Sequence, residues 1–389
     1  MSVTERLRPA GAGAPTLWLQ RLMVTGFRNL RQVELQCEGR PVVLVGPNGA
    51  GKSNLLEAIS LLTPGRGLRR ARQADLDRRG PDNAADGWAV AARIETPFGL
   101  REVGTGRDPA GGERRALRLD GAPASNQQAL GEILACVWLT PAMDRLFLEG
   151  PSARRRFLDR LVAAFDPAHV GRASAYERAY RERARLLREG RADSVWLGAL
   201  ESAMAERSVA IAVARRDLLQ RLSGLLGEAP PLPTPALALA GEVEARLGQE
   251  RALAVEEWLL DRLAAGRLRD AEIGGAAVGA HRTDLLVSDR DRDMPAELCS
   301  TGEQKALLLA VLLAFARLLT LERGAPPLLL LDDVAAHLDD ARLGALFEAL
   351  LQEGIQAWMS GADPAPFAPL RGSAQTFRFD DGSLWRAAA

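Results

Sequence analysis

The stretch Gly46-Pro47-Asn48-Gly49-Ala50-Gly51-Lys52-Ser53 decides the fold, because it matches the phosphate-binding pattern G-x-x-x-x-G-K-[ST] at every fixed position. The apolar residues 42–45 before it predict a buried parallel strand, and residues 54–62 after it have the apolar spacing of a helix. Glycines in such a loop let backbone N–H groups converge on an anion at a helix N-terminus. Strand, loop and helix together predict a nucleoside triphosphate site in an α/β fold.

The polar side chains of this loop have expected tasks. Lys52 would reach the β- and γ-phosphates of ATP, and the Ser53 hydroxyl would take one position around Mg²⁺. Among the 50 basic residues only Lys52 and Lys305 are lysine, and the others are arginine. The P-loop nevertheless has a lysine, because a compact ammonium fits between phosphate oxygens better than a guanidinium does. The flanking elements disfavour the alternative, a glycine-rich turn that binds nothing. The residues expected to contact the nucleotide here are Gly46, Pro47, Asn48, Gly49, Ala50, Gly51, Lys52, Ser53 and Asn54.

The composition is that of a soluble protein with two or three domains. The 389 residues are 47% hydrophobic and 26% charged, and no run of 18 apolar residues predicts a membrane span. Residues 1–15 lack the apolar core of a secretion signal. We therefore expect a cytoplasmic protein without a membrane partner. The chain has three widely spaced cysteines, Cys37, Cys136 and Cys299. Their number and spacing favour a reducing compartment and argue against a disulfide framework or a zinc site in the protein.

The formal net charge is zero, so binding to DNA would depend on local arginine clusters rather than on overall attraction. For any single cluster, the favoured alternative is a solvated helix face balanced by acids. The candidate clusters are Arg66, Arg69, Arg70 and Arg72; Arg154, Arg155 and Arg156; and Arg178, Arg181, Arg183, Arg185, Arg188 and Arg191.

A second phosphate-directed motif lies far downstream, at Cys299-Ser300-Thr301-Gly302-Glu303-Gln304. It precedes a strongly apolar helix expected over 305–319. The Ser300 hydroxyl and the backbone N–H groups near Gly302 are placed to address a phosphate at the start of that helix.

A third motif consists of four leucines, 328–331, followed by Asp332 and Asp333. A buried parallel strand would deliver these carboxylates at its C-terminal edge, where ligands of open α/β sheets bind. Asp332 would complete the Mg²⁺ shell opposite Ser53, and Asp333 would orient or deprotonate the attacking water. A helix over 340–352 and a strand over 355–359 are expected next, ending at Ser360, a position for a γ-phosphate-sensing group.

In this order the motifs resemble those of the ABC-type ATPases, with Ala336-His337-Leu338-Asp339 as the D-loop. In that superfamily the signature of one subunit closes on the nucleotide of another. The resemblance implies that Ser300 and Gly302 bind nucleotide in trans, that the chain forms an ATP-dependent homodimer, and that Lys52, Asp332 and Asp333 are its catalytic residues.

The distance between the P-loop and the signature requires an inserted domain. Its expected helices cover 153–165, 173–188, 194–226 and 250–265, without the sustained heptads of a long coiled coil. The predicted fold class is α/β, an ABC-type P-loop ATPase head with an inserted, mainly helical arm. The expected boundaries are 1–140 for the first part of the head, 141–274 for the arm and 275–389 for the second part.

Specific strings resemble the RecF family of bacterial DNA repair ATPases over about residues 17–360. They are Phe27-Arg28-Asn29; Gly65-Arg66-Gly67-Leu68-Arg69; Thr140-Pro141; the run 150–159 with Arg154-Arg155-Arg156; Gly279-Ala280-His281-Arg282-Thr283-Asp284-Leu285; and the run 330–346.

This resemblance implies dimerisation on duplex DNA at gaps or single-strand/double-strand junctions, with slow ATP hydrolysis resetting the clamp. The implied partners are RecR and RecO, and indirectly the RecA recombinase, in a nucleoid-associated protein. Arg28 would reach the phosphates or the P-loop backbone, or else pair with an acid; Arg69 would stabilise γ-phosphate charge or form a structural salt bridge. The serious alternative is an SMC-like structural chromosome ATPase. A transporter subunit and a small-molecule kinase are disfavoured by the arm and the signature.

The chain departs from the family pattern at a few positions. Ala142 replaces an acidic residue in the loop that takes the place of the Q-loop, and Asp144 is a possible substitute. Ala280 replaces a proline, and Cys299 replaces the leucine that opens the signature. Asp333 is one methylene shorter than the glutamate of other ABC ATPases, which suggests slow hydrolysis. His281 remains open between a buried, hydrogen-bonded histidine and a chemical participant.

Overall fold

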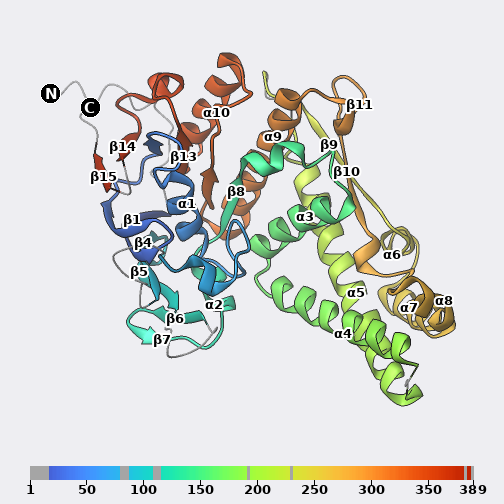
Figure 1. Ribbon diagram of the computed structural model, residues 1–389. Coiled ribbons are helices and arrows are strands. Elements are labelled where there is room, and N and C mark those ends of the chain that lie inside the picture. Colours follow the sequence, from blue (N-terminus) through green and yellow to red (C-terminus); the bar gives the residue numbers. More distant parts are fainter. Residues whose placement is uncertain are drawn as a thin grey trace. The chain divides into compact units, whose positions relative to one another are not determined.

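The computed structural model describes residues 17–78, 87–107, 115–190, 193–227, 231–380 and 383–386 (Figure 1). The expectation about residues 1–15 falls outside these ranges. The chain forms two compact units, of which the head unit comprises Met1–Asp144, Gly227–Thr234 and Ser300–Ala389. The arm unit comprises Arg145–Leu226 and Pro235–Cys299. The first break is close to the expected residue 140, whereas the arm continues past 274 because residues 284–289 pair with an arm strand.

The central sheet of the head unit brings the two ends of the sequence together. Its strand order is β15-β14-β3-β13-β12-β8, parallel except for the edge strand β15. The register aligns Leu331 with Met359, and Gly361 with Val45, so three strands end at one edge. The strands are β3 (Val42–Val45), β8 (Cys136–Leu139), β12 (Leu328–Leu331), β13 (Ala357–Gly361), β14 (Gln375–Asp380) and β15 (Ser383–Arg386).

A second, antiparallel sheet of the head unit has the order β2-β1-β4-β5-β6-β7. Helix α1 (Lys52–Ser60) lies against β1 of this sheet and β13 of the central sheet (Figure 1). It shares one apolar core with both sheets, since its Leu55 and Ile59 belong to the same buried cluster as Leu22 and Leu44. The strands are β1 (Trp18–Phe27), β2 (Leu30–Gln36), β4 (Trp88–Thr96), β5 (Gly99–Arg107), β6 (Arg115–Leu119) and β7 (Ala122–Pro123).

The predicted strand of leucines is confirmed as β12, and it is buried on both faces. Leu328 and Leu330 join the cluster around α1, and the equally buried Leu329 and Leu331 alternate to the other face. The remaining helical segments of the head unit are α2 (Gln128–Ile133), α9 (Thr301–Arg323), α10 (Asp340–Gln352), η2 (Gln73–Leu76) and η7 (Ala365–Leu370), with η4 (Pro141–Arg145) at its boundary.

Helix α9 is the long apolar helix of the second motif. By length and composition it could cross a membrane, alone among the helices in the described ranges, but 78% of its most apolar window is buried within the protein. Its side chains therefore belong to the core of the head unit. The helix begins at the cap Ser300 and ends at Gly324, which has a left-handed φ of 70°.

The arm unit contains the four expected long helices. Residues of α4, α5 and α7 form its apolar core, where the guanidinium of Arg183 pairs with Glu201 and Asp270. A small sheet of order β11-β10-β9, which the sequence did not predict, completes the unit. The elements are α3 (Pro151–Phe165), α4 (His169–Glu189), α5 (Ser194–Ser223), β9 (Pro235–Ala240), α6 (Glu242–Leu247), α7 (Ala252–Ala265), α8 (Arg267–Ile273), η5 (Ala280–Arg282), β10 (Asp284–Asp289), β11 (Met294–Pro295) and η6 (Ala296–Leu298).

Candidate nucleotide site

The P-loop connects β3 to α1 and has a backbone that requires glycine. Gly46 and Gly51 have φ values of 155° and 122°. A Cβ atom on Gly46 would lie 2.3 Å from the carbonyl oxygen of Phe379, and one on Gly51 would lie 2.8 Å from Leu30 Cδ2. The loop can therefore wrap tightly at the N-terminus of α1, where free N–H groups favour an anion.

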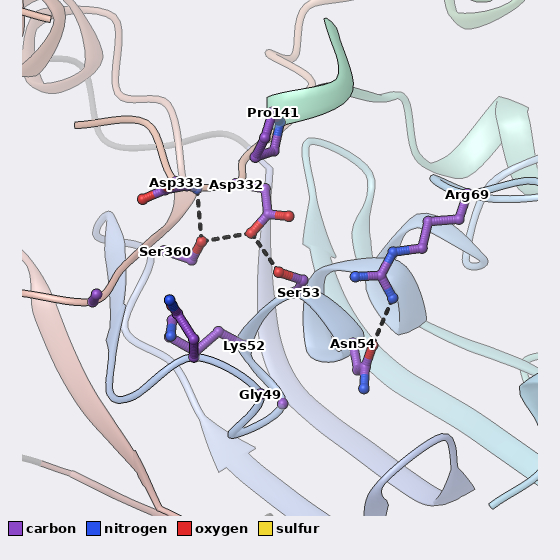
Figure 2. Close-up of a pocket in the computed structure, with 12 residues that line it drawn as sticks. Gly49, Lys52, Ser53, Asn54, Arg69, Pro141, Asp332, Asp333 and Ser360 are labelled. Carbon is purple, nitrogen blue, oxygen red and sulfur yellow. Dashed lines mark hydrogen bonds between the residues drawn. The ribbon is translucent and has the colours of Figure 1, made fainter. Parts of the chain in front are cut away.

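The loop borders a cavity of about 280 Å³ in the head unit (Figure 2). Most of the residues at its wall come from two of the three predicted motifs, the P-loop and the acidic strand end, and from the strand end at Ser360. Gly46, Pro47 and Ala50 of the predicted set do not line it. The lining residues are Asn48, Gly49, Gly51, Lys52, Ser53, Asn54, Arg69, Pro141, Asp332, Asp333, Ser360 and Ala362.

Lys52 and Arg69 both bring positive charge to this cavity, and Lys52 does so from the P-loop. Its ammonium donates to the carbonyl oxygens of Gly46 at 2.6 Å and Pro47 at 2.9 Å. Burial lowers the pKa of Lys52, while the negative charges of Asp332 and Asp333 oppose that shift. Backbone carbonyl oxygens thus hold the ammonium at the mouth of the loop. A bound phosphate could replace these oxygens as hydrogen-bond acceptors.

A chain of hydrogen bonds joins the P-loop to the acidic end of β12 (Figure 2). Ser53 Oγ donates to Asp332 Oδ1 at 2.8 Å, and Ser360 Oγ donates to the same oxygen at 2.7 Å. The backbone N–H of Asp333 donates to Ser360 Oγ at 2.9 Å, which leaves the exposed Asp333 side chain at the cavity. Thus the predicted meeting of Ser53 and Asp332 occurs, and Ser360 braces both aspartates.

The residues at this point fit a Mg²⁺ ion. A hydroxyl and a carboxylate oxygen lie together beside a phosphate-sized cavity, which is the hard, oxygen-rich donor set that Mg²⁺ prefers. Within the described part of the chain no group of three His, Cys, Asp or Glu side chains forms a metal site. Mg²⁺ at nucleotide sites is usually bound by one or two protein oxygens, waters and the phosphates of the nucleotide.

Arg28 does not line the cavity and takes the second of its two expected roles. It lies in the two-residue turn between β1 and β2, and its guanidinium forms a bidentate pair with the buried Glu57 at 3.0 and 2.9 Å. Arg69 does line the cavity, and it also bonds Asn54 at 2.7 Å and Glu57 at 3.1 Å. The salt-bridge alternative is therefore observed for both arginines, and only Arg69 is also at the cavity.

Sequence reasoning missed Glu57 and Asn29 as parts of this site. Glu57, only 1% exposed, orients two arginines; Asn29 donates to the carbonyls of Gly49 and Ala50, each at 3.2 Å, and accepts from Asn54. No clear signal in the sequence pointed to Glu57, because on a helix it shares its face with the polar residues Ser53, Asn54 and Ser60.

The signature residues lie outside the cavity of their own chain. Ser300 forms a capping box with Glu303 at the start of α9. A Cβ atom on Gly302 would lie 2.6 Å from the carbonyl oxygen of His337, so this glycine allows α9 to approach the D-loop. Binding of these residues to a nucleotide in another subunit stays a prediction.

Asp144 is the expected substitute for the acid absent at Ala142, and that role stays a prediction. It is buried, it does not line the cavity, and its carboxylate lies 3.7 Å from the ammonium of Lys305. From its segment only Pro141 reaches the cavity wall.

Some arginines of the predicted clusters form ion pairs that stabilise the fold, and others have exposed side chains. Arg154 pairs with Asp284 at 2.8 and 2.7 Å and donates to Phe147 and Glu149 carbonyls, which orders the start of α3. On α4, Arg181 and Arg185 pair with neighbouring glutamates, as the alternative of a balanced helix face predicted. Arg191 lies outside the described ranges. Arg66, Arg69, Arg70 and Arg72 of the head unit are all exposed.

His281 is a hydrogen-bonded histidine of the arm unit. Its Nδ1 lies 2.6 Å from the Tyr176 hydroxyl, and its Nε2 lies 2.8 Å from the Ala276 carbonyl oxygen. Burial lowers the pKa of His281 to about 4, so the ring is neutral at pH 7. Both ring nitrogens are therefore occupied by structural partners.

The fold and the site together define an ABC-type P-loop ATPase head: a glycine loop on a parallel strand, an acidic strand end beside it, and a capped signature helix. The model of the RecF/RecN/SMC N terminal domain matches residues 18–359. The DNA replication and repair protein RecF of Mesorhizobium japonicum is 49% identical over 371 residues, covering 94% of this chain and 97% of that protein. The RecF of Brucella suis biovar 1 is 45% identical over 94% of this chain and 95% of its own length. The chain therefore belongs to the RecF family.

Solved structures agree on the fold. A structure described as the recombination mediator protein RecF-ATPrS in the RecFOR pathway has a TM-score of 0.84 at 22% identity, covering 97% of this chain and all of that one. The SMC head domain of Pyrococcus furiosus, bound to a domain of ScpA, has a TM-score of 0.53 at 17% identity, with 96% of each chain covered. The predicted fold class, an ABC-type head with an inserted helical arm, is confirmed.

Proposed function

We propose that this chain is an ATP-dependent DNA-binding protein of recombinational repair, which dimerises on duplex DNA at gaps or single-strand/double-strand junctions. The observation that carries the proposal is the hydrogen bond between Ser53 and Asp332 at the mouth of the P-loop, in a chain 49% identical to a DNA replication and repair protein. That bond brings a P-loop hydroxyl and an acidic strand end together, as a Mg²⁺–ATP site requires.

In the proposed site, the P-loop N–H groups and Lys52 hold the β- and γ-phosphates, with Asn54 and Arg69 beside them. Ser53 and Asp332 would hold Mg²⁺, which neutralises phosphate charge when bound. Asp333 orients the attacking water and accepts its proton, while the Ser360 hydroxyl fixes the Asp333 backbone. Arg28 supports the site through Glu57.

Hydrolysis at this site is proposed to be slow and to act as a switch. The backbone of Asp333 has a φ of 51°, in the left-handed region that is strained for residues with a side chain. With one methylene less than glutamate, its carboxylate reaches less far into the cavity. A long-lived ATP state suits a clamp that stays closed until hydrolysis releases it.

The ATP state is proposed to pair two chains head to tail, with Ser300 and Gly302 of each chain on the nucleotide of the other. Two observations support this: both residues lie outside their own cavity, and the hydrogen-bonded cap leaves Ser300 exposed at the end of α9. The dimer would act with RecR and RecO to load RecA. The exposed arginines after α1 are candidates for phosphate contacts, which are insensitive to base sequence.

The proposal is tested by fluorescence anisotropy of a labelled gapped duplex with ATP, with ADP, and at increasing salt. We expect tight binding only with ATP, weakening steeply as salt rises because arginine–phosphate contacts release counterions. Equal binding with ADP and without nucleotide would contradict the proposed switch.

The alternative is a structural chromosome ATPase of SMC type, supported by the shared head fold. Pull-down of purified RecR with the ATP-bound protein separates the two. Capture of RecR supports the repair role, and failure to capture it in the ATP state favours the structural alternative.

A further inference from the structure

Lys305, the second of the two lysines in the chain, is buried in the head unit with its ammonium bonded to the loop that follows β12. The side chain is 1% exposed, and Nζ donates to the carbonyl oxygens of Asp333 at 3.0 Å and Ala336 at 2.7 Å. Its charge faces the carboxylate of Asp144 at 3.7 Å. A buried ammonium persists only with such partners, because removing it from water is costly.

The loop that Lys305 holds, residues 332–339, has an unfavourable backbone. Asp333 and His337 have φ values of 51° and 65°, in the left-handed region that residues other than glycine rarely adopt. Each such residue costs on the order of 1–2 kcal/mol, so the loop needs fixed contacts to keep its shape. The two hydrogen bonds from Lys305 supply such contacts, one at the carbonyl of Asp333 and one at Ala336, next to His337.

Lys305 therefore joins three segments that meet around the candidate nucleotide site. It stands on α9, three residues after Gly302, which lies so close to the carbonyl oxygen of His337 that a Cβ atom there would be only 2.6 Å from it. Its ammonium reaches the 332–339 loop, whose Asp333 lines the cavity, and faces Asp144 in the segment whose Pro141 also lines it. Two walls of the cavity are thus connected to the start of the signature helix through one cation.

The ammonium also has a second arrangement within short reach. The separation of 3.7 Å from Asp144 Oδ2 is longer than a hydrogen bond, and the buried Asp144 Oδ1 has no hydrogen-bond partner among the described residues. A movement of less than about 1 Å would exchange a loop carbonyl for a direct bond to the carboxylate. Such an element, with two discrete arrangements, is what coupling between two sites requires.

We propose that Lys305 is a positioning residue that transmits occupancy of the nucleotide cavity to the N-terminus of α9. This proposal rests on the proposed ATP site. Phosphate bound beside Asp333 and Pro141 shifts the 332–339 loop, and Lys305 and Gly302 carry that shift to Ser300, where a second subunit would meet it.

The test is hydrogen–deuterium exchange of the full-length protein with and without ATPγS, comparing wild type with Lys305→Met. In wild type, we expect nucleotide to protect three regions: the P-loop, residues 332–339, and residues 300–304. In Lys305→Met, we expect protection of the P-loop to remain and nucleotide affinity to stay within about threefold. Residues 300–304 should lose their nucleotide-dependent protection, and residues 332–339 should exchange at least about fivefold faster even without nucleotide.

Arg317→Met is the matched control, because it removes a cation from the same helix. Arg317 pairs with Glu353 at 2.8 Å and is about one-third exposed. It should keep nucleotide-dependent protection of residues 300–304. A merely structural role for Lys305 would lower the thermal stability of Lys305→Met without separating P-loop protection from protection at α9.

The proposal is overturned if Lys305→Met responds to ATPγS at residues 300–304 as wild type does. It also falls if wild type shows P-loop protection without any change at 300–304, which leaves the ATP site intact. Absence of P-loop protection in wild type would instead refute the proposed ATP site, and the coupling with it. If Lys305→Met does not fold, Asp144→Asn decides: it keeps the volume and removes the charge partner, and wild-type protection at 300–304 would overturn the proposal.

Discussion

Ser53 and Asp332 are 279 positions apart in the sequence, yet their side chains share a hydrogen bond of 2.8 Å. The parallel sheet explains this proximity: β3 and β12 both flank β13, and all three strands end at one edge. An arm inserted between the two motifs therefore leaves the site intact, because neither strand belongs to the inserted unit. The two parts of the head form the site only when this sheet is assembled.

Replacement of Lys52 by alanine should abolish tight binding of ATP. The ammonium is the only lysine at the cavity, and loss of its charge-assisted bonds to phosphate costs about 2–3 kcal/mol, or roughly 30- to 150-fold in affinity. Titration with a fluorescent ATP analogue measures the effect. Arg317→Met serves as the control that removes a cation away from the cavity; unchanged binding by Lys52→Ala would remove the P-loop assignment.

Replacement of Ser300 by arginine should leave ATP binding to the monomer within about twofold of wild type and prevent the ATP-dependent dimer. A bulky cation at the exposed cap blocks the approach of a second subunit, whereas the cavity of the same chain does not include this residue. Both Ser300→Arg and Ser300→Ala lose the cap of α9, at a cost of about 1 kcal/mol. Sedimentation velocity with ATP distinguishes them, and a dimer of normal affinity in Ser300→Arg would contradict binding in trans.

Replacement of Glu57 by glutamine should destabilise the protein and weaken nucleotide binding together. Glu57 is buried and pairs with Arg28 and Arg69, so removal of its charge should cost about 3 kcal/mol in unfolding free energy. Urea denaturation measures that loss. Glu102→Gln is the matched control, because the Arg93–Glu102 pair is exposed and contributes at most about 1 kcal/mol. Equal stability of the two variants would show that Glu57 does not hold the arginines.

Acid should destabilise the arm unit through Asp159. Burial raises the pKa of Asp159, but the hydrogen bond from His169 and the charge of Arg215 outweigh it and lower the pKa from 3.8 to about 2. A folded-state pKa below the unfolded one stabilises the protein above about pH 4, and the contribution disappears as pH falls toward 2. It amounts to about 2 kcal/mol. Denaturation of wild type and Asp159→Asn at pH 6 and pH 2.5 should give a difference that shrinks at the lower pH; a constant difference would contradict this origin.

The candidate site was predictable from the sequence where a motif acts locally. The glycines of the P-loop, the buried leucines before Asp332 and the cap at Ser300 each specify a local structure whose chemistry is visible in a few residues. The order of the three motifs then fixed the class of the head. Expected helix bounds in the arm were close for the same reason, because apolar periodicity is a local signal.

The remaining features depend on contacts between residues distant in sequence. Nothing local to Arg28 says that its partner is Glu57, since the pairing exists only once β1 and α1 pack together. Likewise, β10 pairs with β9, although three helices separate the two strands in the sequence. Because of this pairing, the arm unit extends beyond the expected residue 274. Lys305 was conspicuous in composition, but its two carbonyl partners come from a loop whose strained shape no motif encodes.

The most direct test of the central claim, an ATP-gated dimer on DNA, is light scattering of the Asp333→Asn variant. This substitution removes the carboxylate that would accept the proton of the attacking water, while the backbone bond to Ser360 can remain. We predict a monomer without nucleotide, a dimer with ATP, and a more stable dimer when a short gapped duplex is added. A monomer under all three conditions would contradict the clamp and leave only a nucleotide-binding head.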